Sequence, residues 1–288
     1  MSAGRGWGPE RRPAAVCVSF DNLGEVTDLQ RGLWPEDEPL GRHFSVTRAL
    51  PRILALLEQL DLRATFFVEG LNAELYPDTL AELAAVGHEV AYHGWCHETW
   101  DDLEPGREAD LLSQGVRAME ALGIRLEGLR PPGGRLGAET LGLLRGLGFR
   151  HCSPAGTGVG VEEEIVVLPF AWPLLDAYRY LPRFADLRER DSGVGEPQSP
   201  ARFDAALAAA LDEAVARRRQ LTLVFHPFLA LPEERFAVIE RRLEAVRALV
   251  DAGDVWCAPH RDVAAWVADA RGDDAAGLEA LRLDPTVA

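Results

Sequence analysis

The sequence predicts an α/β fold in which helices cover a parallel sheet. Three observations support this class. Strand-like and helix-like segments alternate seven or eight times along the 288 residues. No linker or internal repeat divides the chain. Four short polar motifs each follow a predicted strand directly, as active-site residues do in parallel α/β folds. The alternation alone leaves two architectures open, a β/α barrel and a doubly wound sheet.

The expected elements follow from hydrophobic periodicity. The first strand is the apolar run 14–20, and a long loop follows it to about residue 42. Further strands are expected at 64–68, 89–91, 125–129, 149–152, 165–168, 221–225 and 255–257. Apolar residues spaced by three and four predict helices at 50–60, 79–86, 107–122, 138–147, 201–219, 233–252 and 262–270. The segment 170–200 resists assignment. We divide the chain into an N-terminal extension (1–13), one domain (14–270) and a C-terminal tail (271–288).

The charge balance bears on partners and location. The net charge is −16, and every basic residue other than histidine is an arginine. This balance argues against nucleic acid or an anionic membrane as the main partner. Apolar runs are too short for a transmembrane helix, and the first thirteen residues lack the apolar stretch of a secretory signal. We therefore expect a cytoplasmic protein.

Two of the polar motifs could bind a metal or activate water. Asp21 and Asn22, in SFDN, end the first predicted strand. His93 and His97, in HGWCH, would share one face of a helical turn and could bind one ion. Ordinary polar packing of the two histidines is the alternative. Cys96 lies between them and cannot easily point in the same direction.

Two further motifs supply an arginine and a histidine. Arg130 opens the rigid turn RPPGG, and it could hold a carboxylate in a bidentate pair or lie solvated on the surface. His226 follows the strand LTLVF. A lone histidine is usually structural, but beside the other motifs it becomes a candidate general acid.

Together these motifs resemble the NodB-type polysaccharide deacetylases, also called carbohydrate esterase family 4. SFDN, HGWCH, RPPGG and VFHP stand in the chain order of that family's motifs. The wording YHGWCHE is closer to a branch that holds peptidoglycan-deacetylase-like and cyclic-amide-hydrolysing relatives. The resemblance implies a distorted (β/α) barrel of about seven parallel strands in a single domain, and hydrolysis of an N-acyl amide.

The resemblance also implies roles for residues. Asp21 would be the base, His93 and His97 metal ligands, Arg130 the residue that orients Asp21, and His226 the acid that protonates the leaving amine. The cofactor would be a divalent metal, Zn²⁺ first and Co²⁺, Ni²⁺ or Mn²⁺ as alternatives. A bound divalent ion activates water and polarises the carbonyl.

Two departures from the family pattern stand out. Asn22 occupies the position of the metal-binding aspartate, and an uncharged amide should bind the ion more weakly unless Asp21 or Glu25 takes that place. No Asp-Trp segment is evident, and Trp172 is the nearest candidate for an aromatic wall. Candidates for contact with the substrate are Trp95, Pro132, Gly133 and Trp172.

The expected function is metal-dependent removal of an acetyl or formyl group from the nitrogen of a small intracellular molecule, such as an amino sugar or natural-product intermediate. Long loops at the catalytic end, around Trp34 and Tyr178, favour a small substrate over a polymer. Metal-independent opening of a cyclic amide and ligand binding without catalysis are the alternatives that the asparagine motivates. The sequence leaves open whether the protein forms a homo-oligomer.

Overall fold

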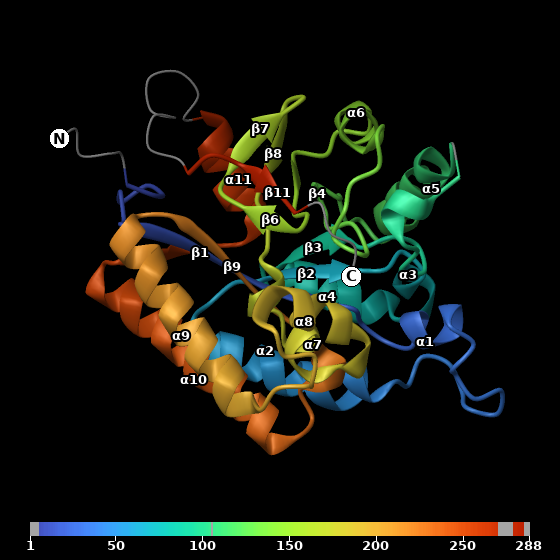
Figure 1. Ribbon diagram of the computed structural model, residues 1–288. Coiled ribbons are helices and arrows are strands. Elements are labelled where there is room, and N and C mark those ends of the chain that lie inside the picture. Colours follow the sequence, from blue (N-terminus) through green and yellow to red (C-terminus); the bar gives the residue numbers. More distant parts are fainter. Residues whose placement is uncertain (1–5, 105, 270–278, 285–288) are drawn as a thin grey trace.

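The computed structural model describes residues 6–104, 106–269 and 279–284. Seven parallel strands lie side by side in the order β9–β1–β2–β3–β4–β5–β8 (Figure 1). Their bounds are β1 (Ala14–Asp21), β2 (Thr65–Val68), β3 (Glu89–Tyr92), β4 (Gly128–Leu129), β5 (His151–Cys152), β8 (Ile165–Val167) and β9 (Gln220–Phe225). β10 (Val255–Cys257) pairs with the first half of β1, and β7 (Gly160–Glu162) runs antiparallel to β8.

The sheet curls into an incomplete barrel rather than a doubly wound sheet, which confirms the predicted fold class. In the described part of the chain, no strand ladder closes the barrel between β8 and β9. A single bridge, from Leu175 to Val224, links the segment after β8 to β9. The barrel is therefore open on this side, next to the segment that the sequence left unassigned.

Alternation along β1 decides which side chains reach the barrel interior. Val16, Val18 and Phe20 belong to the large cluster that packs against the outer helices. Ala15 and Cys17 belong to a second cluster with Val263 and other residues of α11. Successive side chains of a strand point to opposite faces. Ser19 and Asp21 therefore share the inner face with Ala15 and Cys17, and they lie at the carboxyl end of the strand.

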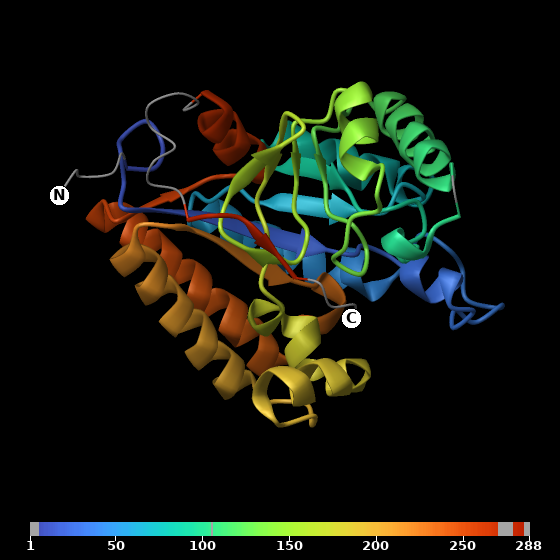
Figure 2. The same cartoon turned by 45° about the horizontal axis from the view of Figure 1, so that its top comes forward.

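The expected helices are present with boundaries moved by a few residues, and α9 and α10 lie side by side along one flank (Figures 1 and 2). Their bounds are α2 (Leu50–Gln59), α4 (Pro77–Ala85), α5 (Arg107–Glu120), α6 (Thr140–Gly146), α9 (Pro200–Arg217), α10 (Glu233–Ala252) and α11 (His260–Asp269). The helices that the sequence did not predict are short: α1 (Val26–Gln30), α3 (Asn72–Leu75), α7 (Asp176–Tyr180) and α8 (Ala185–Ser192). Helices of four to eight residues offer too few positions for a periodic pattern.

Parts of both expected extensions pack on the domain. Trp7 is buried, and its ring lies 5.0 Å from that of Trp266. β11 (Arg282–Leu283) pairs antiparallel with β6 (Gly156–Thr157), so backbone hydrogen bonds hold this part of the expected tail. Residues 1–5, 271–278 and 285–288 of the extensions lie outside the described residues. No helix in the described ranges is long and apolar enough to cross a membrane.

Candidate active site

A cavity of about 260 Å³ opens at the carboxyl ends of the strands. It brings together the polar residues of all four sequence motifs, which come from positions as distant as 21 and 226. The polar side chains around it are those of Asp21, Asn22, Gln30, Arg31, His93, His97, Thr99, Arg130, Arg183 and His226. A cavity of this size fits part of a small ligand rather than a whole one, and its open side leaves room for the remainder.

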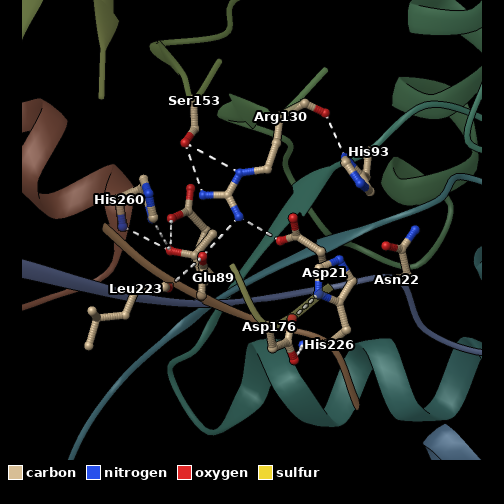
Figure 3. Close-up of polar contacts among 12 residues, drawn as sticks. Asp21, Asn22, Glu89, His93, Arg130, Ser153, Asp176, Leu223, His226 and His260 are labelled. Atoms are coloured by element: carbon tan, nitrogen blue, oxygen red, sulfur yellow. Dashed lines mark hydrogen bonds and ion pairs between the residues drawn. The ribbon is translucent and has the colours of Figure 1, made fainter. Parts of the chain in front are cut away.

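Arg130 holds Asp21 from inside the barrel (Figure 3). Its Nη1 donates to Asp21 Oδ1 at 2.6 Å and to Ser19 Oγ at 2.9 Å, and its Nη2 donates to Ser153 Oγ at 2.9 Å. The guanidinium lies over the ring of Phe67, 4.0 Å from its centre. The ion pair is fully buried, and it uses one arginine nitrogen rather than the expected bidentate contact. One carboxylate oxygen of Asp21 is therefore fixed, and no hydrogen bond from the described residues engages the other.

His93 and His97 adjoin each other in a loop, not on a helical turn. The backbone turns through left-handed conformations at Gly94 (φ 77°) and His97 (φ 66°). The Glu98 carboxylate accepts the backbone N–H groups of Trp95 and Cys96, which stabilises the loop. The two imidazole rings lie 4.9 Å apart and nearly perpendicular. The helical expectation was wrong because glycine and these carboxylate contacts favour a tight loop here.

The protonation state of both histidines suits metal ligation. Burial lowers the pKa of His93 to about 4 and that of His97 well below its usual range, so both rings are neutral near pH 7. His93 Nδ1 donates to the carbonyl oxygen of Arg130 at 2.7 Å, and its Nε2 is left as the free lone pair. Hydrogen bonding of one ring nitrogen in this way fixes the tautomer of a metal-binding histidine. Burial also raises the pKa of Cys96 to about 11, so it remains a thiol.

Asn22 is fixed by a carboxylate that the sequence analysis missed. Its Nδ2 donates to Glu69 Oε1 at 2.5 Å, and Glu69 also accepts from Asn72 Nδ2 and the Leu23 backbone N–H. Burial raises the pKa of Glu69 to about 8. Because the amide nitrogen of Asn22 faces Glu69, its Oδ1 is free to accept or to coordinate. Asn22 itself stands in a left-handed conformation (φ 61°) at the end of β1.

His226 is held by a second missed residue, Asp176. His226 Nδ1 lies 2.5 Å from Asp176 Oδ1, and the His226 backbone N–H donates to Asp176 Oδ2 at 2.8 Å (Figure 3). Asp176 is the first residue of α7, in the segment that the sequence left unassigned. The carboxylate fixes the ring orientation with Nδ1–H toward Asp176, so Nε2 is the nitrogen available to a ligand in the cavity.

Aromatic side chains form one wall of the cavity. Phe170, Trp172 and Phe184 line it, with ring centres 5.0 Å apart for the first pair and 5.7 Å for the second. Gly133 lines it as expected, and its φ of 80° needs a residue without a side chain. Trp95 and Pro132 do not line it.

The two residues have other packing roles. Trp95 packs against Gly70, where a Cβ atom would come within 2.5 Å of its ring. The carbonyl oxygen of Pro132 accepts the Trp100 backbone N–H. The sequence placed them at the site because their neighbours are there. Their own side chains are directed into packing against adjacent loops.

The side chains at the cavity offer a divalent ion an unusual set of ligand atoms. Among the described residues, no three His, Cys, Asp or Glu side chains converge around one point. Asp21 does not join the histidines in such a group, since Arg130 holds its Oδ1. Glu25 does not either, because its carboxylate accepts from Tyr76 Oη and the Gly41 backbone and holds the loop after β1. The donors that fit are two neutral imidazoles and the freed oxygen of Asn22.

Comparison with known proteins agrees with this geometry. The polysaccharide deacetylase family model matches residues 36–152, which include the HGWCH and RPPGG motifs. A candidate polysaccharide deacetylase from Mycobacterium smegmatis has a crystal structure that superposes with a TM-score of 0.75 at 26% identity, over 92% of this chain and 93% of that one. Residues 36–152 of this chain thus match the polysaccharide deacetylase domain, the family that the sequence motifs resemble.

Curated relatives match this chain over shorter stretches. The peptidoglycan deacetylase-like protein FGM2 of Gibberella zeae is 29% identical over 43% of this chain and 36% of its own length. The chitin deacetylase of Colletotrichum lindemuthianum is 40% identical over 28% of this chain and 33% of its own length. The match thus spans about a third of these relatives. Their names are those of hydrolases that act on carbon–nitrogen bonds other than peptide bonds, which is the enzyme class that the sequence predicted.

The sequence analysis missed three residues that hold the side chains of the four motifs. Glu69, Asp176 and Ser153 are isolated polar residues in apolar or irregular segments. Glu69 alone offered a hint, because it directly follows the strand TFFV, as Asp21 follows its own apolar run. Polar residues at the carboxyl ends of parallel strands tend to meet, and this rule would have included Glu69 among the candidates.

Proposed function

We propose that this protein hydrolyses an N-acyl amide on a carbohydrate-like or other small substrate. One observation carries the proposal. Asp21 and His226 line the same cavity, and a buried charged side chain holds each of them. Arg130 holds the carboxylate of Asp21, and Asp176 holds the imidazole of His226. Such a pair supplies a base and an acid on two fixed elements. The family match supports amide hydrolysis as the reaction class.

In the proposed reaction, Asp21 removes a proton from water through its unengaged oxygen as the water attacks the carbonyl carbon. His226 donates a proton from Nε2 to the amide nitrogen as the carbon–nitrogen bond breaks. The products are a carboxylic acid and an amine. Arg130 orients Asp21 and pairs with its charge, and the Asp176 carboxylate balances the charge of the His226 ring while it carries the proton.

A divalent cation, Zn²⁺ in the first place, would be held by His93, His97 and Asn22. When bound, it would supply positive charge that activates water and polarises the carbonyl group. The free Nε2 of His93 and the free Oδ1 of Asn22 support this assignment. The donor set carries no charge of its own, so we expect weaker binding than with an aspartate at position 22.

The test is release of acetate or formate from a panel of N-acylated amino sugars, small N-acyl amines and cyclic amides. We expect turnover that requires a divalent metal and that is abolished in Asp21→Asn and His226→Ala. Turnover of cyclic amides by metal-stripped protein would instead favour the metal-independent alternative. Ligand binding without turnover on the whole panel would favour a non-catalytic protein.

A further inference from the structure

Two unpaired arginines stand at the cavity that holds Asp21 and His226. Arg31 directly follows α1, and Arg183 lies in a short helix (Pro182–Phe184) before α8, so they come from separate loops. Both line the cavity, and both also line an adjoining hollow that reaches His43 and Phe228. Neither guanidinium forms an ion pair with any carboxylate among the described residues.

The charges of these two arginines oppose each other. Both residues are solvent-exposed beside the cavity, and partial desolvation followed by the charge of Arg31 lowers the pKa of Arg183 to about 10. The nearest counter-charge is Asp28, which favours the charged form of Arg183 but lies toward His43, 3.9 Å from its Nε2. Arg130 is neutralised by Asp21. Arg31 and Arg183 therefore leave positive charge at the cavity of a protein whose net charge is −16.

The aromatic wall adds to the site. The Arg183 guanidinium lies 5.1 Å from the centre of the Phe184 ring, and that ring lies next to Trp172. Arg31 and Arg183 line the same cavity as His93 and His97, so their charges border the proposed metal ligands. A ligand in the cavity can thus contact the aromatic wall, the reacting groups and both guanidiniums together.

We propose that the substrate of this site carries an anionic group, a carboxylate or a phosphate, bound between Arg31 and Arg183. Paired guanidiniums bind such oxyanions with charge-assisted hydrogen bonds and planar complementarity. The inference rests on the proposed function for the identity of the site. It selects, among N-acyl compounds, those with an acidic group near the acylated nitrogen. Neutral chitin-like sugar chains lack this group.

The test is binding, measured without turnover, of matched acidic and neutral probes to the full chain. One arm compares N-acetylglycine with N-acetylglycinamide, and the other compares N-acetylglucosamine 6-phosphate with N-acetylglucosamine. Quenching of tryptophan fluorescence, to which Trp172 contributes from the cavity wall, or calorimetry reports the dissociation constants. We expect the acidic member of at least one pair to bind about tenfold tighter than its neutral counterpart. A preference in the first pair indicates a carboxylate site, and a preference in the second pair indicates a phosphate site.

Variants decide whether the arginines cause the preference. Arg31→Gln and Arg183→Gln should each reduce it, and the double change should remove it with little effect on the neutral probe. Arg52→Gln, an exposed arginine outside the cavity, is the matched control. Equal affinity for acidic and neutral probes, no binding of either acidic probe at millimolar concentration, or a preference unchanged in the double variant would overturn the proposal. Because no step is turnover, failure of the hydrolase proposal would appear separately, as anion binding in a protein that cleaves no amide.

Discussion

The amide of Asn22 donates to the buried carboxylate of Glu69 at 2.5 Å, directly behind the cavity that holds His93 and His97. A carboxyl group thus stands behind the Asn22 amide rather than at position 22. Because burial raises the pKa of Glu69 to about 8, this group acts near pH 7 mainly by orienting the amide, so that its oxygen faces a ligand. Glu25, which the sequence suggested for this purpose, is occupied by Tyr76 instead.

Glu69 should therefore control metal affinity. In Glu69→Gln, one carboxyl oxygen becomes an amide nitrogen, so Asn22 or Asn72 loses its acceptor and the Asn22 amide is no longer held in one orientation. We expect the affinity for Zn²⁺, measured by competition with a chromogenic chelator, to fall about tenfold or more. The double variant Asn22→Asp with Glu69→Gln places a carboxylate at position 22 and should restore or exceed native affinity.

Glu25→Gln is the matched control, because Glu25 is as buried as Glu69 and accepts two hydrogen bonds where Glu69 accepts three. Its change should leave zinc affinity unaltered. Native affinity in Glu69→Gln, with the protein folded by circular dichroism, would show that Asn22 does not depend on Glu69.

The ion pair between Arg130 and Asp21 should dominate stability as well as activity. In Arg130→Met, Asp21 remains buried without its cation, and we expect a loss of about 3 kcal/mol or more in the free energy of unfolding by urea. Arg52→Met removes an exposed pair with Glu233 and should change stability little. Similar effects from the two variants would mean that Asp21 finds another partner or a proton.

The sequence predicted the elements that carry strong local patterns. The motifs that contain Asp21, His93, Arg130 and His226 follow apolar strands. They meet at one cavity because the strands are parallel and their carboxyl ends lie at the same edge of the sheet. Glu69 and Asp176 were missed because a partner's identity depends on packing between segments 47 and 50 residues apart. The helical turn at HGWCH was wrong because spacing in sequence cannot distinguish a helix from a loop through left-handed Gly94.

Acid should destabilise the fold partly through His88. Its ring accepts a backbone hydrogen bond from the Ala64 N–H at 3.2 Å, and burial lowers its pKa to about 4. The unfolded chain binds a proton at this residue near pH 6.5, and the folded protein does so only near pH 4. Stability from this group is therefore complete above pH 6.5 and is lost as the pH falls toward 4.

The measurement is the free energy of unfolding at pH 7 and pH 5 in native protein and in His88→Asn, whose side-chain oxygen can accept the same bond. We expect the native protein to lose more stability over this interval than the variant, by an amount of order 1 kcal/mol. Equal losses would assign the acid sensitivity to other buried histidines.

Asp176 should act on catalysis only through His226. Asp176→Asn keeps the size of the side chain but removes the charge opposite the protonated ring, so kcat should fall about 100-fold or more with KM little changed. His226→Ala should cost as much or more. Because the two residues form one unit, the double variant should be no slower than His226→Ala alone, whereas independent roles would multiply the two losses. Asp191→Asn, which touches Tyr178 and Arg190 instead, is the matched control and should retain native kcat.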